Sequence, residues 1–129
     1  MWTLESLYAE AGLQTTAVFD ERALQSPWTK HTRRWLDRAS APTALAIHDA
    51  ACLLDLEGII IDGSMSRELL QSFLTAVARA LETYDWQGVT RPVVHAGSIG
   101  ADARAVGGAL LPLYANFAPD RDLFIKEHA

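Results

Sequence analysis

Residues 59–66 read Ile59-Ile60-Ile61-Asp62-Gly63-Ser64-Met65-Ser66, an apolar run followed by small and polar residues. Three consecutive isoleucines are typical of a buried strand. Ser66 precedes apolar residues at three- and four-residue intervals, which is the pattern of an amphipathic helix with a serine cap. The residues between them therefore form a βα turn. Such a turn exposes backbone amides beside the carboxylate of Asp62.

A second strand and helix follow this first pair. The first strand is predicted over residues 57–62, and the helix after it is the strongest in the chain. The second strand, at residues 91–95, leads through Gly97-Ser98-Ile99-Gly100 into a helix that begins at Asp102 and stops near Pro112. Strands joined by a crossover helix pair in parallel, and parallel sheets are normally covered on both faces. The sequence therefore predicts a parallel βαβα unit.

Helices are predicted to fill most of the chain before that unit. Residues 2–11 form a short helix, and residues 17–27 suit a loop with a helical turn. A third segment begins as a helix at Pro27 and is broken at Ser40-Ala41-Pro42. Thr43 then caps a helix over residues 44–55, which is rich in Ala and Leu almost all round and is expected to be buried.

The fold class that follows is α/β, with three helices before the parallel βαβα unit, in a single domain over residues 1–129. Within that domain the structure of residues 1–27 stays open. Two strands alone are too few for a stable sheet, because independent stability normally needs three or more. Either short strands lie in the first 40 residues or something outside the chain completes the sheet. An exposed strand edge favours self-association, so we expect a homo-oligomer.

Composition narrows the classes of partner. The 129 residues carry a net charge of −5, with 11 basic and 16 acidic residues, which argues against direct nucleic-acid binding by this chain. The one locally basic stretch, Lys30-His31-Thr32-Arg33-Arg34, is interpreted as a solvated helix face. Cys52 lies among apolar residues and is expected to be a small core residue. No signal peptide or membrane-spanning run is visible, so the expectation is a cytoplasmic protein that does not contact a membrane.

The candidate ligand site lies where the two predicted strands end. The carboxyl ends of parallel strands meet at one edge of the sheet, where ligands of open α/β folds bind. The turns there, around Gly63–Ser66 and Ser98–Asp102, should offer unpaired amides to an anion or a nucleoside. The predicted ligand-binding or cofactor-binding residues are Asp62, Gly63, Ser64, Gly97, Ser98 and Gly100.

Other reactive side chains are better explained structurally. We interpret both His48 and His95 as structural histidines. Ser64 and Ser66 lack the Gly-x-Ser-x-Gly pattern of a nucleophile, and Ser66 is expected to cap a helix. Asp55 and Glu57 are expected to lie exposed at a connection. We therefore predict neither a catalytic residue nor a metal ligand.

Glycines inside the last helix call for a packing reason. Gly107 and Gly108 each cost about 1 kcal/mol relative to alanine in a helix interior. Close contact between this helix and the sheet would supply that reason. Gly108→Val is then expected to overpack the contact and destabilise the domain.

Several segments together resemble a known family. They are Trp35-Leu36-Asp37, Leu45-Ala46-Ile47, Leu54-Asp55, Ile60-Ile61-Asp62-Gly63, and the long run from Gly100-Ala101-Asp102 to Leu111-Pro112-Leu113. In these segments residues 28–117 resemble ROK proteins, which include sugar-responsive repressors and sugar kinases. The resemblance implies an actin-like, ribonuclease H-like ATPase fold. It matches only the end of that family's C-terminal lobe, so the chain is similar to a C-terminal fragment of a ROK protein.

The family's functional motifs are largely missing from this chain. It has no Asp-x-Gly-Gly-Thr phosphate loop, and one cysteine cannot form the Cys-x-Cys-x-x-Cys zinc site. Asp62 stands where the kinases usually have a glycine on the adenosine side, and its charge would repel a nucleotide more than it would help to bind ribose.

The resemblance therefore implies part of a ROK-type, sugar-responsive transcriptional regulator that is not catalytic alone and needs no cofactor. One alternative is a lobe of an ATP-dependent sugar kinase, in which case ATP is the cofactor and another polypeptide supplies the catalytic residues. The other alternative is a homodimerising assembly module. A sugar or nucleotide is an expected ligand only for the parent protein.

Overall fold

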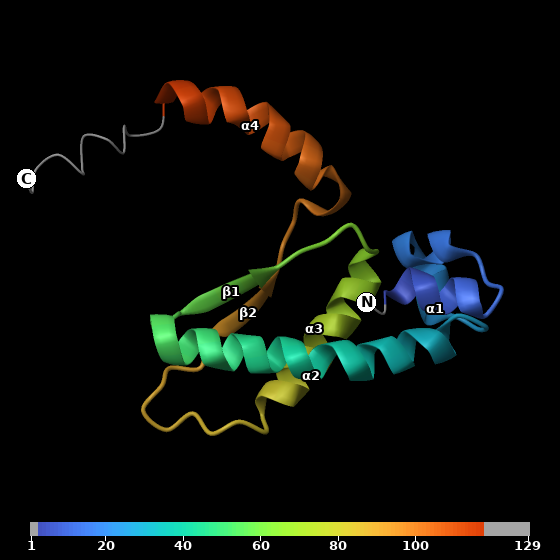
Figure 1. Cartoon of the computed structure of the whole chain (residues 1–129), viewed down its shortest axis with the longest axis horizontal. Helices are drawn as coiled ribbons and strands as arrows, with labels where there is room; N and C mark the ends of the chain where they lie inside the picture. Colours follow the sequence, from blue (N-terminus) through green and yellow to red (C-terminus); the bar gives the residue numbers. More distant parts are fainter. Residues whose placement is uncertain (1–2, 118–129) are drawn as a thin grey trace, which may run out of the picture.

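The computed structural model describes residues 3–117. It is an α/β structure in which helices pack around a small parallel sheet (Figure 1). In chain order the elements are α1 (Leu4–Glu10), η1 (Thr15–Phe19), η2 (Glu21–Leu24), α2 (Thr29–Leu54), β1 (Gly58–Ile61), α3 (Arg67–Leu81), β2 (Val93–Ala96), η3 (Gly100–Asp102) and α4 (Ala103–Phe117), where η marks a 3-10 helix.

The N-terminal segment forms a closed core of its own, the N-terminal cluster. Its buried residues are Leu4, Tyr8, Ala17, Val18, Ala23 and, from α3, Leu69. The hydroxyl of Thr32, on α2, donates a 2.6 Å hydrogen bond to the carbonyl of Ala23, which leaves the Thr32 oxygen to accept from Tyr8 at 2.5 Å. The predicted short helix is confirmed, with Thr3 as its N-cap. This segment consists of one α-helix and two 3-10 helices.

α2 corrects the prediction of two helices separated at Ser40-Ala41-Pro42. It runs unbroken for 26 residues and contains Pro42. Proline offers no N–H to the helix ladder, but Ser40 and Ala44 on either side are buried, and the packing carries the helix through. Thr43 is not an N-cap. Its hydroxyl donates to the carbonyl of Ala39 at 2.8 Å, within the helix.

The C-terminal end of α2 is more exposed than its composition predicts. Ala44, Ile47 and Ala51 are buried, yet Leu53 is 82% exposed and Leu54 is 67% exposed. Cys52 is also exposed, so its assignment to the core was wrong. An apolar composition predicts burial only where another element supplies a covering surface, and here one side of the helix has none within residues 3–117.

The predicted βαβ unit is confirmed. β1 and β2 pair in parallel, with Gly58 opposite Val93 and Ile61 opposite Ala96. Ser66 caps α3, since its hydroxyl accepts from the amide of Leu69 at 3.3 Å. α3 turns its apolar stripe inward, and its buried residues are Leu69, Leu70, Phe73, Leu74, Val77 and Leu81.

Helices cover only one face of the sheet. Ile59, Ile61 and Val94 pack against the second core cluster, which α2 and α3 build around Ala44, Ile47, Phe73, Val77 and Leu81. Alternate residues point the other way. On that outer sheet face Ile60 is 73% exposed and Val93 is 57% exposed. Cover on both faces was predicted and is not found in the described chain, and its first 40 residues hold no strand.

α4 extends away from the rest of the structure (Figure 1). Its principal contacts are with η3, which precedes it. It continues past Pro112 to Phe117, so the predicted stop near Pro112 was wrong. A side chain at Gly107 or Gly108 would meet no atom within 4 Å, which removes the predicted overpacking at Gly108 in this chain alone.

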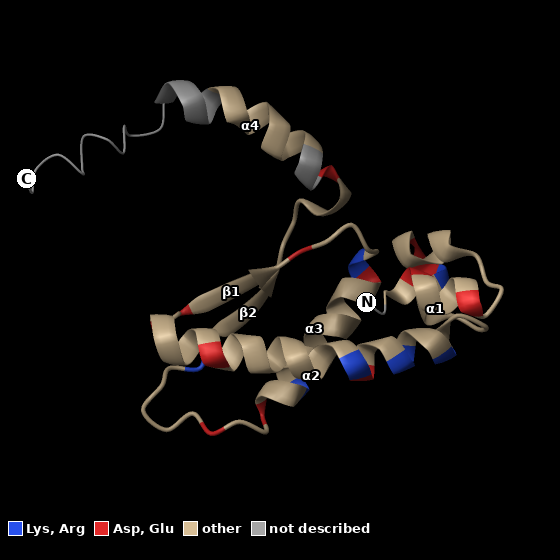
Figure 2. Ribbon diagram, in the orientation of Figure 1, with Lys and Arg blue, Asp and Glu red and all other residues tan. Residues whose placement is uncertain are grey.

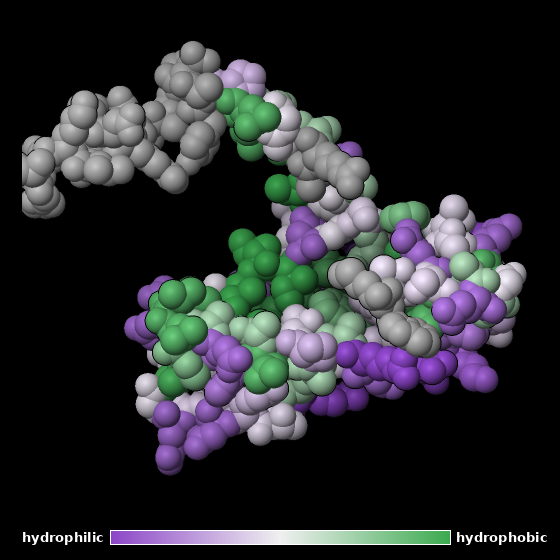
Figure 3. Space-filling view, in the orientation of Figure 1, coloured by the Kyte–Doolittle hydropathy of each residue, from purple (hydrophilic) through white to green (hydrophobic). Residues whose placement is uncertain are grey.

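Charge and hydropathy divide the surface. The basic residues of 30–34 lie along the first turns of α2 and face solvent, as predicted (Figure 2). Apolar surface gathers over the sheet and the C-terminal end of α2 (Figure 3). No helix within the described residues is both long enough and apolar enough to cross a membrane.

Candidate functional site

The two strand ends meet as the sequence predicts. The amide of Gly97 donates to the carbonyl of Ile61 at 2.8 Å, so the parallel ladder continues one step beyond the strands. This brings the turn that begins at Asp62 against the loop that begins at Gly97. The predicted site residues from the two βα turns therefore share one edge of the sheet.

The carboxylate of Asp62 bridges the two turns. One of its oxygens, Oδ2, accepts hydrogen bonds from the amides of Ile99 and Gly100, each at 2.9 Å. The other, Oδ1, accepts from the amide of Gly63 at 2.8 Å. Three backbone donors therefore converge on a single side chain.

Arg67 completes this arrangement from the first turn of α3. Its guanidinium pairs with Asp62 at 3.1 Å and also donates to the carbonyls of Gly63 and Gly97, each at 2.8 Å. Arg67 was not among the residues predicted for this site. The signal was its position directly after the Ser66 cap, five residues beyond Asp62, where a long side chain can reach back over the turn. We call Asp62, Arg67 and the bonded amides the Asp62–Arg67 cluster.

The electrostatics of the cluster follow from these contacts. The amide of Gly100, then that of Gly63, and next the guanidinium of Arg67 stabilise the ionised carboxylate and lower the pKa of Asp62 from 3.8 to about 2. The side chain of Asp62 is 23% exposed and that of Arg67 is 45% exposed. Solvent therefore reaches both partners of this ion pair.

The amides predicted to be free are in large part already bonded. Gly63, Ile99 and Gly100 donate to Asp62, and the amide of Ser66 donates to the carbonyl of Val18 at 3.0 Å. The prediction of unpaired amides was wrong at these positions. The physical reason is that the fold holds the carboxylate of Asp62 and the carbonyl of Val18 beside these amides, at a high effective concentration, so that they accept the hydrogen bonds that a ligand would need.

Two glycines are required by the cluster. A side chain at Gly97 would overlap that of Asp62, with its Cβ 2.5 Å from the Asp62 Cγ. Gly100 has a φ of +62°, and its Cβ would lie 2.6 Å from the guanidinium of Arg67. Both glycines make room for the chain's own side chains.

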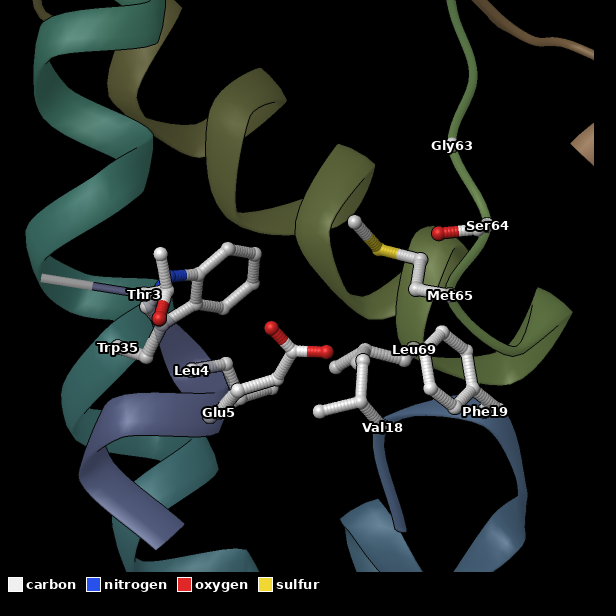
Figure 4. Close-up of a pocket in the computed structure, with 10 residues that line it drawn as sticks. All are labelled: Thr3, Leu4, Glu5, Val18, Phe19, Trp35, Gly63, Ser64, Met65 and Leu69. Atoms are coloured by element: carbon white, nitrogen blue, oxygen red, sulfur yellow. The ribbon is translucent and has the colours of Figure 1, made fainter. Parts of the chain in front are cut away.

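The remaining predicted residues, Ser64 and Ser98, are exposed. Ser98 lies in the loop between Gly97 and Ile99. Ser64 and Gly63 line a pocket of about 370 Å³ between the first turn and the N-terminal segment (Figure 4). The other lining residues are Thr3, Leu4, Glu5, Val18, Phe19, Trp35, Met65 and Leu69.

This pocket is mostly apolar. Figure 4 shows the carboxylate of Glu5 reaching into it between Trp35 and Leu69. A second hollow of about 350 Å³ on the other side of Met65 includes Arg67 together with three acidic residues, Asp20, Glu21 and Glu68. Neither hollow suits a polyphosphate, because carboxylates outnumber cations in both and the guanidinium of Arg67 is already bonded.

The contacts of His48 support the structural interpretation, whereas that of His95 stays a prediction. The ring of His48 stacks on Tyr84 with centroids 4.7 Å apart, meets Trp86 edge-on and lies 3.3 Å from the carbonyl of Asp85. His95 is exposed on the outer sheet face. Within the described residues no three His, Cys, Asp or Glu side chains gather in a way that would hold a metal ion.

Asp55 and Glu57 are both exposed, at the connection between α2 and β1. Asp55 ends the helix with a φ of +49°. Its amide bonds to the carbonyl of Ala51 at 3.1 Å, as in a helix C-cap. These residues therefore form the turn by which the chain passes from α2 into β1.

The arrangement at the strand ends is thus a structural brace beside an apolar pocket. It holds one anion, the carboxylate of Asp62, which belongs to the chain itself. Comparison with known proteins adds no family to this description: no protein-family model, no curated protein and no solved structure matches the chain.

Proposed function

We propose that this chain is a non-catalytic module that works by associating with a second copy of itself. The observation that carries the proposal is the uncovered outer sheet face, where Ile60 is 73% exposed and Val93 is 57% exposed. Parallel sheets are normally covered on both faces. A two-stranded parallel sheet with one bare face, apolar apart from His95, is therefore an incomplete layer, and a second copy can complete it.

The neighbouring surface supports the same conclusion. Leu53 and Leu54, at the end of α2, add exposed apolar area beside the sheet, and Figure 3 shows this area as continuous with the strands. Contiguous apolar patches on proteins mark interaction sites more often than isolated exposed side chains do. Both strands of the sheet are also edge strands, which leaves backbone groups available for pairing.

The sugar-kinase alternative is less well supported by the site. ATP would need amides and cations for its phosphates. At the strand ends the amides of Ile99 and Gly100 bond to Asp62, and Arg67 is committed to the same carboxylate. A nucleotide would have to displace a carboxylate whose pKa is already lowered to about 2. We therefore do not assign ATP as a cofactor.

The proposed assignment to a protein family rests on the sequence resemblance alone. The resemblance to ROK proteins supports an assignment of this α/β unit to the end of an actin-like, ribonuclease H-like lobe of a sugar-responsive regulator. The replacement of a glycine by Asp62 favours the regulator branch over the kinases. In that setting self-association is the activity of this chain, and recognition of sugar belongs to the parent protein.

The test is the solution mass by light scattering over a wide range of protein concentration. We expect a reversible rise from monomer to dimer. Ile60→Lys should hold the protein as a monomer. Association would bury the lysine ammonium on the outer sheet face without an opposite charge, which costs free energy. Leu24→Lys is the matched control, since Leu24 is an exposed leucine in η2, away from the sheet, and should leave the mass unchanged.

A wild-type protein that stays monomeric at every concentration would overturn the assembly proposal. The kinase alternative has its own measurement. Calorimetric titration with ATP and Mg²⁺ should give no binding, whereas saturable binding would restore the kinase lobe as the better assignment.

A further inference from the structure

Two apolar surfaces of this chain lack a cover, and they lie on different elements. One is the outer sheet face, with Ile60 and Val93. The other is on α4, where Val106 is 38% exposed, Leu110 is 51% exposed and Leu111 is 69% exposed. A helix and the face of a parallel sheet are the two surfaces that pack together in α/β folds. The chain therefore carries both halves of one missing layer contact.

The two halves are apart within one molecule. α4 projects beyond the sheet, and Figure 3 shows open space between most of α4 and the apolar surface over the strands. The residues that lead into α4 account for this separation. The amides of Ile99 and Gly100 bond to Asp62, and the amide of Asp102 bonds to the carbonyl of Ile99 at 3.4 Å. These bonds hold the loop and η3, from which α4 leaves the sheet.

Turning α4 back onto its own sheet would require a change of backbone conformation at or before its junction with η3. A second copy avoids this cost. We propose that two copies exchange their α4 arms, so that α4 of each chain covers the outer sheet face of the other. This inference rests on the proposed self-association and specifies how it occurs. Exchange of an identical element is a low-cost route to a dimer.

The sizes of the two surfaces are compatible with this exchange. α4 has 15 residues and is therefore about 22 Å long. Two such arms laid on two sheets bury on the order of 1,000 Å² in total, near the lower limit for a specific interface. The dimer is therefore reversible and depends on concentration. Exposed Leu53 and Leu54 extend the surface on which the arm lies.

The glycine pair of α4 has a role in such a contact. Glycine disfavours a helix, yet Gly107 and Gly108 lie inside α4 and neither would meet a neighbouring atom if it carried a side chain. Their own chain therefore supplies no packing reason for them. In the exchanged dimer Gly107, which shares a helix face with Leu110 and Leu111, lets the arm approach the partner's backbone closely.

Cysteine cross-linking between chains tests the exchange. Cys52 is exposed and is first replaced by serine, so that introduced thiols react alone. One sample then carries Ile60→Cys and the other carries Leu110→Cys. A short flexible bis-maleimide is added after the two samples are mixed, and the products are separated by denaturing electrophoresis. We expect a covalent heterodimer. Leu24→Cys in place of Ile60→Cys is the control and should give none.

The doubly substituted chain, with Ile60→Cys and Leu110→Cys together, separates exchange from closure. Exchange gives covalent dimers. Closure of α4 on its own sheet gives a cross-linked monomer, together with no heterodimer from the mixed single variants, and would overturn the proposal.

Light scattering on the same samples distinguishes failure of the arm exchange from failure of the proposed assembly function. A dimer without the mixed cross-link overturns the exchange and leaves the assembly function standing. Absence of any dimer removes both. Leu110→Glu provides a second readout that does not depend on thiol geometry, and it should weaken dimerisation roughly tenfold or more. An unchanged dimerisation constant for this variant would count against the arm.

Discussion

The N-terminal cluster and the sheet with α4 use similar apolar residues to opposite effect. In the N-terminal cluster Leu4 and Leu69 are nearly inaccessible, and Tyr8 is buried with its hydroxyl bonded to Thr32. On the outer sheet face and α4, Ile60 and Leu111 are each more than two-thirds exposed. The first region is covered within one chain, whereas the second leaves apolar surface uncovered within residues 3–117. Residue type alone does not distinguish them, because burial depends on which elements lie opposite.

The largest effect should come from truncating a side chain in the closed region. Leu69 is fully buried where α3 meets the N-terminal cluster, so Leu69→Ala should cost about 2–5 kcal/mol of unfolding free energy. Leu111→Ala is its counterpart on α4 and should change the stability of dilute, monomeric protein by less than about 0.5 kcal/mol. Chemical denaturation measures both. Equal losses would erase the distinction between the two regions.

A smaller effect is expected from removing one polar group of the closed region. Tyr8→Phe keeps the ring but loses the hydrogen bond to Thr32, and should cost about 1 kcal/mol. Burial raises the pKa of Tyr8, so the phenol stays protonated through neutral pH and can serve as the donor. Thermal unfolding of the single variant and of Tyr8→Phe with Thr32→Val tests the coupling. Fully additive losses would show that the two hydroxyls do not interact.

The Asp62–Arg67 cluster lies at the junction of the two regions and should respond to acid. Because the folded-state pKa of Asp62 is lowered to about 2 from 3.8, its ionised form stabilises the folded protein above about pH 4. That contribution is lost as the pH falls from about 4 to about 2. Solvent reaches the ion pair, so the effect should be modest.

Asp62→Asn should therefore flatten the stability profile within that acid window. Stability is measured by denaturant unfolding at a series of pH values. Asp20 also has a lowered pKa, caused chiefly by its hydrogen bond with Arg22, so Asp20→Asn is the necessary comparison. If the Asp62→Asn profile had the same slope as wild type, Asp62 would not be the titrating group.

The smallest effect is expected from a methyl group added to the arm. A Cβ at Gly108 would meet nothing within 4 Å, so Gly108→Ala should leave the melting temperature of dilute protein unchanged. Alanine favours helix over glycine by about 1 kcal/mol, which should raise the helical signal of α4 slightly in circular dichroism. A clear drop in melting temperature would mean that α4 packs against its own chain.

Local patterns in the sequence determined the centre of this fold. The isoleucines of residues 59–61 predicted β1, the apolar stripe after Ser66 predicted α3, and residues 91–95 predicted β2. The structure has all three within a few residues and pairs the strands in parallel. They also placed the turns at Asp62 and Gly97 side by side. These features depend on how apolar residues recur along the chain and on the Ser66 hydroxyl, which caps a helix through an amide only three residues away. Both are short-range effects.

Long-range contacts decided the rest. Burial on both sides of Pro42 keeps α2 in one piece, although the local rule predicts a break. Cys52 and Leu53 lie in an apolar run, but within residues 3–117 nothing covers them. The side chain of Arg67 reaches Gly97, thirty residues on, and joins Asp62 in closing the predicted anion site. The sequence by itself determined β1, α3 and β2 and the parallel pairing of the two strands. Only the tertiary structure decided which surfaces are buried and which amides are free, because both depend on groups distant in the chain.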